Sequence, residues 1–215
     1  MVKTRNSHHA DTRQHILTTA YPIILGKGFA AVGLSEILSA AQVPKGSFYH
    51  YFESKEQFGC ALLENYFDQY LLSIDDVLQD DDRPPLLRLL AYFENWQLTQ
   101  DCDTSTDKCL VVKLSGEVTD LSEPMRLALN HGTQQIVARL ATCIQQAMNT
   151  QAITFEDGAH ALAQELYYLW VGATLLTKVN NTAEALSVAM RATRHRLGIT
   201  TESFSSLNSL KRTAR

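Results

Sequence analysis

The sequence predicts an all-α protein in which a small N-terminal three-helix unit precedes a larger helical body. Apolar residues recur at helical spacing along nearly all of its 215 residues. No segment of useful length alternates apolar with polar residues, as a half-buried β-strand would. With 45% hydrophobic and 20% charged residues, the composition is that of a soluble globular protein with a proper core.

The first three predicted helices follow one another near the N-terminus. Asp11 is a capping residue for a first helix, which is expected to end at Gly26 and Gly28. A short second helix spans about residues 34–41. After a tight turn at Gln42, a third helix begins near Pro44, a residue favoured in a first helical turn. Two short helices joined by a tight turn are the arrangement of a helix-turn-helix unit.

The remainder of the chain predicts longer helices. The run Ser54-Lys55-Glu56-Gln57 has the S-x-x-Q form of a capping box and opens a helix to about Gln79, where an acidic run with two prolines breaks it. Further helices are predicted at about residues 86–99, 109–117, 122–150, 156–178 and 182–197. The helix over 156–178 is apolar on most sides, so it is either central to its domain or lies between its own core and a partner.

These elements divide the chain into a helix-turn-helix domain over residues 1–56, a larger helical domain over residues 57–200 and a disordered tail over residues 201–215. Charge is distributed unevenly between them. Residues 1–56 hold six Lys or Arg and four Asp or Glu, a net charge of +2, whereas the remainder carries −6. A polyanionic partner is therefore expected only for the N-terminal domain.

An aromatic run inside a charged context marks the third predicted helix. Helical spacing puts Phe48, Tyr51 and Phe52 on one face and Lys45, Gly46, Tyr49 and His50 on the other. The first face can pack into a core. The second offers a cation, a phenol, an imidazole and a glycine that permits close approach, which favours a helix that contacts DNA in the major groove. The alternative is a three-helix unit whose polar face is only solvated.

The segment GFAAVGLSEILSAAQVPKGSFYHYFESKEQF resembles the N-terminal domain of the TetR family of transcriptional repressors, and its K-G-S-F-Y-H-Y-F-x-S-K-E run is the most specific part of the match. The resemblance implies double-stranded operator DNA as the partner. It also implies roles for single residues: contact with DNA by Lys45, Gly46, Ser47, Tyr49 and His50, contact with phosphate by Lys55, and contact with the DNA backbone by Ser35.

Two residues depart from the pattern of that family. Gln42 stands where the turn usually has glycine, so a non-glycine residue is expected to take a left-handed conformation. Pro44 replaces the usual serine cap.

Two further segments, CLVVKLSGEVTDLSEPMRLAL and LYYLWVGATLLTKV, resemble NemR-type repressors of the same family, which respond to cysteine-modifying compounds. The resemblance implies that a reactive electrophile or oxidant is the effector, that Cys109 is the sensing thiol and that Lys178 lies near it. A neighbouring ammonium favours the reactive thiolate. Two alternatives stay open: Cys109 is a small core residue, or the effector is a small unsaturated acid or aldehyde that binds non-covalently.

The other cysteines are assigned lesser roles. Cys102, seven residues before Cys109, is either a resolving partner or an incidental thiol, whereas Cys60 and Cys143 lie on apolar helix faces and are expected to be packing residues. The four show neither CxxC pairs nor a dense framework, and the N-terminus has no apolar signal region. We therefore expect reduced thiols in a cytoplasmic protein.

The aromatic side chains of the larger domain allow two interpretations. They either line a ligand cavity or are ordinary core residues at helical spacing. The four candidates are Tyr92, Trp96, Tyr167 and Trp170.

Several functions are not expected. His131, His160 and His195 show no ligand spacing, so we predict no metal site, and no motif implies a cofactor or an active site. The longest charge-free apolar stretch is too short to span a membrane. Remote alternatives are an enzyme with Cys109 as nucleophile and an architectural DNA-binding protein.

We expect a homodimer. One recognition helix supplies few base contacts, so two-fold symmetry would pair two half-sites on a palindromic operator. The helices over residues 156–178 and 182–197 are expected to form the interface.

Overall fold

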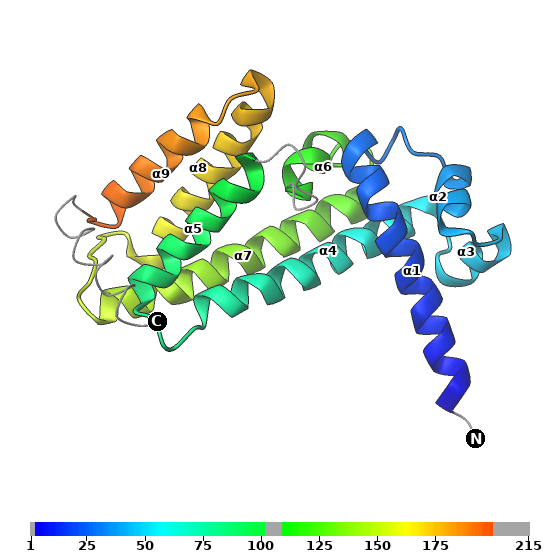
Figure 1. The fold of residues 1–215 in the computed structure, drawn as a ribbon, viewed down its shortest axis with the longest axis horizontal. Helices are drawn as coiled ribbons and strands as arrows, with labels where there is room; N and C mark the ends of the chain where they lie inside the picture. Colours follow the sequence, from blue (N-terminus) through cyan, green and yellow to red (C-terminus); the bar gives the residue numbers. More distant parts are fainter. Residues whose placement is uncertain (1–2, 102–108, 200–215) are drawn as a thin grey trace. The chain divides into compact units, whose positions relative to one another are not determined.

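The computed structural model describes residues 3–101 and 109–199. Within these residues the chain forms nine α-helices and no β-strand, which confirms the predicted fold class (Figure 1). The helices are α1 (Lys3–Lys27), α2 (Leu34–Ala41), α3 (Lys45–Tyr51), α4 (Lys55–Leu78), α5 (Pro85–Asp101), α6 (Leu110–Val118), α7 (Glu123–Asn149), α8 (Gly158–Asn180) and α9 (Glu184–Arg196). The predicted tail over residues 201–215 lies outside the described part.

The start of α1 differs from the prediction and its end agrees with it. The helix begins at Lys3, so the assignment of Asp11 as its cap was wrong. No glycine or proline occurs between Lys3 and Asp11, and nothing in the backbone chemistry stops the helix there. At the other end Gly28 adopts φ +93°, and its N–H donates to the carbonyl of Ile24 at 2.7 Å. A residue with a Cβ is strained in that conformation.

The turn between α2 and α3 has the left-handed geometry that the sequence predicts. Gln42 adopts φ 54° and ψ 38°. Its own N–H and that of Val43 donate to the carbonyls of Ser39 and Leu38, at 3.3 and 3.1 Å. These bonds satisfy carbonyls at the end of α2 that have no partner inside the helix. The reversal directs the chain into α3 without a glycine.

A small core holds α1, α2 and α3 together and includes the start of α4. Phe48 and Phe52 of the α3 segment are 0% and 1% exposed, and each ring contacts that of Phe58, with centroids 5.5 and 5.2 Å apart. Buried aliphatic residues of α1 and α2 complete the core: Ile16, Leu17, Ala20, Ile24 and Ile37. The apolar face predicted for the third helix is therefore confirmed for Phe48 and Phe52, whereas Tyr51 is half-buried.

The predicted capping box opens α4. The N–H of Gln57 donates to the Oγ of Ser54 at 3.0 Å, and the Gln57 side chain accepts the N–H of Glu53 at 2.6 Å. The N–H groups of Glu53 and Gln57, which have no acceptor within the helix, are satisfied in this way.

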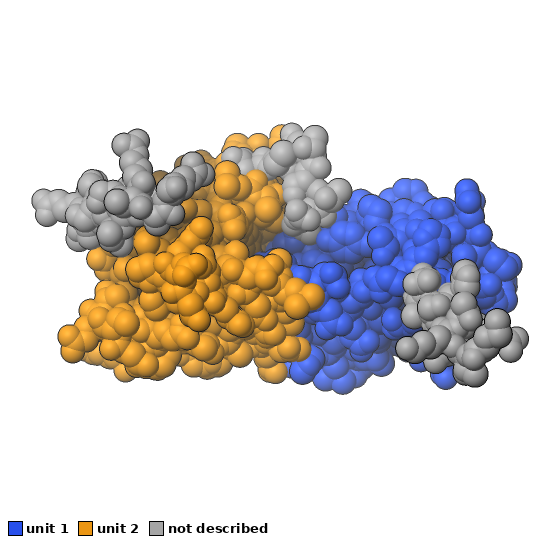
Figure 2. Space-filling model, turned by 60° about the horizontal axis from the view of Figure 1, so that its bottom comes forward, with its two compact units in different colours: residues 1–70, 108–133 blue, residues 71–107, 134–215 orange. Residues whose placement is uncertain are grey.

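The chain divides into two compact units, which are coloured separately in Figure 2. Unit 1 consists of residues 1–70 and 108–133, and unit 2 consists of residues 71–107 and 134–215. The helices α1, α2 and α3 therefore share a compact unit with α6 and the beginning of α7. The functional division at residue 56 stays a prediction.

Candidate DNA-binding face and sensing thiol

The polar face of α3 lies on the surface as predicted. Lys45, Gly46 and His50 are exposed, and Tyr49 is 49% exposed although its ring contacts the buried Phe48. The Lys45 ammonium lies 5.8 Å from the centroid of the Tyr49 ring. A cation and a phenol at adjacent points of one short helix suit contacts with phosphate and with base edges.

The two serines assigned to DNA contact differ in exposure. Ser35, in the first turn of α2, is exposed, and Ser47 of α3 is half-buried. Contacts with DNA by either residue stay predictions.

Lys55 makes contacts inside the protein that the sequence did not indicate. Its ammonium donates to the backbone carbonyl of Phe29 at 2.9 Å and lies 4.8 Å from the centroid of the Phe29 ring. Such a contact combines a charge-assisted hydrogen bond with a cation–π interaction. Lys55 therefore helps to hold the connection between α1 and α2, and its contact with phosphate stays a prediction.

Two residues of α6 bind this connection or the end of α1 that precedes it, and sequence reasoning did not single out either of them. The carboxylate of Glu117 accepts the N–H of Phe29, at 3.0 Å, and the N–H of Ala30. The Lys113 ammonium lies 3.4 Å from the carbonyl oxygen of Gly26. No sequence pattern signals these contacts, because the partners are 87 or 88 positions apart.

Cys109 occupies the N-cap position of α6. Its backbone adopts φ −59° and ψ 107°, its carbonyl accepts the N–H of Lys113 at 3.2 Å, and its side chain is half-buried. An anion at this position is favoured by the free N–H groups of the first helical turn. The structure thus places the predicted sensing thiol at the beginning of the helix that carries Lys113 and Glu117.

The two predicted partners of Cys109 are Lys178 and Cys102. Lys178 is an exposed residue in the last turn of α8 and belongs to unit 2, whereas Cys109 belongs to unit 1. Cys102 lies outside the described residues. The proximity of either residue to Cys109 stays a prediction.

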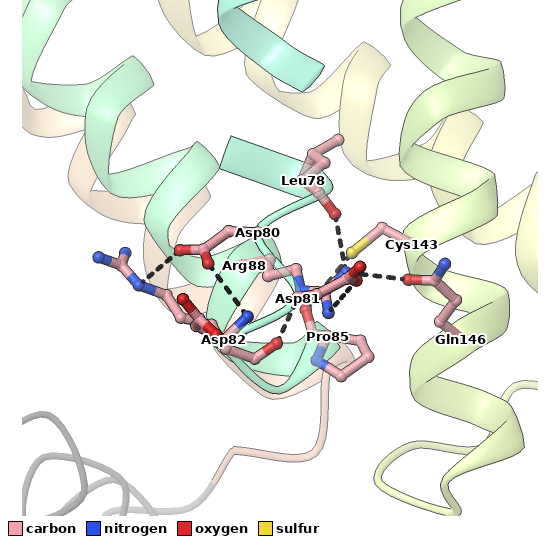
Figure 3. A network of polar contacts seen from close by, with 9 residues as sticks. Leu78, Asp80, Asp81, Asp82, Pro85, Arg88, Cys143 and Gln146 are labelled. Atoms are coloured by element: carbon pink, nitrogen blue, oxygen red, sulfur yellow. Dashed lines mark hydrogen bonds and ion pairs between the residues drawn. The ribbon is translucent and has the colours of Figure 1, made fainter. Parts of the chain in front are cut away.

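Cys143 lies in a network of polar contacts in unit 2, shown in Figure 3. Its thiol is 2% exposed and donates to the carbonyl of Pro85 at 3.4 Å. Burial raises the pKa of Cys143 to about 11, although the guanidinium of Arg88 acts in the opposite direction. Arg88 is itself buried and donates to the carbonyls of Leu78 and Arg83, at 3.2 and 2.7 Å. A thiol in such surroundings is a structural group.

The thiolate of Cys60 is also disfavoured. The side chain is half-buried on α4, and burial raises its pKa, with the carboxylates of Glu64 and Glu56 acting in the same direction. The thiolate, which is the reactive form, is therefore disfavoured at neutral pH.

We expect thiol labelling to separate these cysteines. At pH 7.5 the folded protein should not take up N-ethylmaleimide at Cys143, and Cys60 should react more slowly than in the unfolded chain, because both thiols have raised pKa values. Site-resolved mass spectrometry measures this directly. Labelling of Cys143 as fast as in urea would contradict it.

The raised pKa of Cys143 makes the stability of the fold depend on pH. The pKa of Cys143 is about 11 in the folded protein against an ordinary value of 9.0, so the unfolded chain loses its proton first. Its contribution to the unfolding free energy is complete below pH 9 and is lost as pH rises towards 11, by roughly 2–3 kcal/mol. Replacing Cys143 with alanine should remove this pH dependence.

The four aromatic residues proposed for a ligand cavity form one buried cluster in unit 2. Trp96 contacts the rings of Tyr92, Tyr167 and Trp170, with centroid distances of 5.9, 5.8 and 5.7 Å. All four residues are at most 6% exposed. The indole N–H groups are satisfied inside the protein, by Thr174 for Trp96 and by Thr193 for Trp170. This packing suits a core, and a ligand role for the cluster stays a prediction.

The described residues contain no group of three or more His, Cys, Asp or Glu side chains that could hold a metal ion. None of the helices searched in this part of the chain is long and apolar enough to cross a membrane.

Comparison with known proteins agrees with the fold and with the helix-turn-helix unit. Residues 16–58 match the family described as "Bacterial regulatory proteins, tetR family", and residues 85–193 match "Tetracyclin repressor-like, C-terminal domain". The HTH-type transcriptional repressor NemR of Escherichia coli K12 is 42% identical over 181 residues, which cover 84% of this chain and 90% of NemR. The HTH-type transcriptional repressor DhaR of Mycobacterium sp. GP1 is 34% identical, over 81% of this chain and 86% of DhaR.

Solved structures give the same result. The crystal structure of the reduced form of E. coli NemR superimposes with a TM-score of 0.82 at 39% identity and covers 86% of this chain and 96% of that one. A regulatory protein TetR from Rhodobacter sphaeroides superimposes with a TM-score of 0.74 at 30% identity, over 85% and 97% of the two chains. The chain therefore belongs to the TetR family and is a DNA-binding transcriptional repressor similar to NemR.

Proposed function

We propose that this repressor leaves its operator when Cys109 is modified by an electrophile or an oxidant. The observation that carries the proposal is the position of Cys109 at the start of α6. In this helix the Glu117 side chain binds the connection between α1 and α2, and the Lys113 side chain contacts the last turn of α1. The similarity to NemR supports it, since a structure of NemR is described as a reduced form. The test is release of a bound operator by stoichiometric modification of this thiol.

Electrophiles with an electron-poor C=C bond would react at Cys109 by addition. The thiolate sulfur forms a bond to one carbon, the π bond breaks, and the other carbon takes a proton from water. Nothing leaves, and no group is oxidised or reduced. The product adds bulk at the N-cap of α6 and removes the anionic form of the sulfur.

Peroxides would act by a second route. The thiolate attacks one peroxide oxygen, the O–O bond breaks, and a sulfenic acid and hydroxide are formed. The sulfenic acid then condenses with a thiol such as Cys102, or with the neutral amine of Lys178, and releases water. Both products carry a new bond between α6 and another segment, and a dithiol reductant returns Cys109 to the thiol.

The active species is proposed to be a homodimer. Although Leu166, Tyr167 and Trp170 are buried in α8, the same helix exposes Tyr168, Leu175, Leu176 and Val179, by 62, 51, 50 and 69%. In α9, Val188 is 44% exposed. A helix with apolar residues on both its core side and its outer side is suited to lie between its own core and a partner.

Sedimentation velocity tests the dimer. At micromolar concentration the protein should sediment as a dimer of 24.0 kDa chains, and replacing Leu175 and Val179 with aspartate should shift it to the monomer and weaken operator binding. Replacing the exposed Leu72 of α4 with aspartate is the matched control and should leave the dimer intact. A wild-type monomer under these conditions would contradict the proposal.

A palindromic operator and a cytoplasmic location follow from this proposal. Two recognition helices related by a two-fold axis would contact two half-sites about one helical turn, roughly 34 Å, apart. A repressor acts where the bacterial chromosome lies, which supports the cytoplasmic location. Its relatives are transcriptional regulators, and modification of Cys109 is proposed to be stoichiometric, without turnover.

A further inference from the structure

We infer that Glu117 is a positioning residue for DNA binding and couples α6 to the helix-turn-helix unit. The inference concerns the backbone from the last turn of α1 to the start of α2, which three charged side chains bind: Lys55, Lys113 and Glu117. We call these three residues the loop clamp. The inference deepens the proposed function, because α6 begins at Cys109.

Glu117 makes the most extensive contact of the loop clamp. Its two carboxylate oxygens accept the N–H groups of Phe29 and Ala30, which lie outside any helix. Space at this point is tight, because a Cβ added at Gly28 would lie 2.8 Å from Oε2 of Glu117. A charged acceptor for two adjacent backbone donors fixes both the position and the orientation of this short segment.

The two lysines of the loop clamp bind the complementary backbone groups. Lys113 lies 3.4 Å from the carbonyl oxygen of Gly26, in the last turn of α1, and Lys55 donates to the carbonyl of Phe29. Carbonyls at a helix C-terminus have no partner within the helix and carry partial negative charge. The carboxylate thus meets N–H groups and the ammonium groups meet carbonyls, so all three contacts are electrostatically favourable.

The sequence register connects the loop clamp to the proposed sensor. Cys109, Lys113 and Glu117 are spaced at i, i+4 and i+8, so the N-cap position and the two clamp residues follow one face of α6. Eight residues of helix correspond to about 12 Å. Because a short helix moves as a rigid element, a displacement at its N-cap is carried to Glu117.

The loop clamp acts on a segment that DNA binding depends on. The connection that it holds leads directly into α2, and the left-handed turn at Gln42 joins α2 to α3. Movement of Phe29 and Ala30 would therefore be passed to the face of α3 that contacts DNA. Loss of the Glu117 contacts should lower operator affinity without unfolding the protein.

The test compares Glu117→Ala, Glu117→Gln and Lys113→Met with Glu123→Gln. Glu123 is a matched control, since its carboxylate binds Arg126 within the same exposed helical turn of α7. Glu117→Ala should weaken operator binding by the unmodified protein roughly tenfold, and Glu117→Gln and Lys113→Met should weaken it less. Glu123→Gln should bind as the wild type does. Circular dichroism checks that each variant is folded.

Two further readouts separate the coupling from the sensor. Amide hydrogen exchange at Phe29 and Ala30 should be faster in Glu117→Ala, and also in wild-type protein modified by N-ethylmaleimide. The ratio of operator affinities before and after that modification should be smaller in Glu117→Ala than in the wild type. Normal affinity, normal exchange and a normal ratio in folded Glu117→Ala would overturn the inference. A wild-type complex that survives modification would instead overturn the proposed sensing, while the unmodified variants still test the loop clamp.

Discussion

The Cys109→Ser protein is expected to bind its operator as the wild type does and to stay bound during treatment with N-ethylmaleimide or hydrogen peroxide. The hydroxyl of serine keeps the size of the side chain but forms neither the thioether nor the sulfenic acid. We expect the wild type to lose operator affinity roughly tenfold or more under the same treatment, because Cys109 begins the helix that carries the loop clamp. Fluorescence anisotropy with labelled operator measures both proteins.

Matched thiol variants make this experiment specific. Cys60→Ser and Cys143→Ala should respond like the wild type, since burial disfavours the reactive form of both thiols. Lys178→Met should blunt the response to peroxide more than that to N-ethylmaleimide, because only the oxidative route uses its amine. If Cys109→Ser is still released at wild-type doses, another thiol is the sensor, and Cys102 is the next candidate. If no single cysteine matters, a non-covalent ligand is the effector.

Substitutions on α3 should divide into two classes. Tyr49→Ala should weaken binding to any duplex, whereas Lys45→Ala and His50→Ala should lower specific binding by about 1–3 kcal/mol and relax base preference. All three side chains can reach DNA, because they share the exposed face of α3 while the opposite face, with Phe48, is buried. The two classes correspond to contacts with the DNA backbone and contacts with base edges. Binding to the operator and to a random duplex at several salt concentrations measures the division. Equal losses on both duplexes for all three variants would contradict it.

Lys55 requires a separate comparison. Lys55→Met should weaken binding to every duplex for two reasons, since it removes a predicted phosphate contact and also the hydrogen bond to the carbonyl of Phe29. The salt dependence distinguishes the two, because loss of a phosphate contact lowers the slope of log affinity against log salt by about one. A lower affinity with an unchanged slope would assign Lys55 to the loop clamp alone.

Local sequence patterns predicted most of the fold. Helical periodicity located the helices, and the S-x-x-Q run placed the start of α4. The resemblance to the TetR family, whose turn usually has glycine where Gln42 stands, implied the left-handed turn that the structure has. The error at Asp11 has a physical cause. A capping residue is compatible with a helix start but does not enforce one, and the residues before it allow the helix to continue to Lys3.

The candidate sites were predicted less completely. The two faces of α3 follow from helical spacing within seven residues, so sequence reasoning could assign Lys45, Tyr49 and His50 to the surface. The Glu117 contacts with Phe29 and Ala30 depend on how distant segments fold together, which no local pattern encodes. The same holds for Lys55, whose position in a recognised motif suggested only a contact with DNA.

The most direct test uses a protein in which Cys109 is the only cysteine, made by Cys60→Ser, Cys102→Ser and Cys143→Ala. Operator affinity is measured while N-ethylmaleimide modifies an increasing fraction of the protein, and intact-mass spectrometry gives that fraction. We predict that the fraction able to bind operator falls in step with the fraction modified at Cys109. Complete modification of Cys109 with unchanged operator affinity would contradict the account.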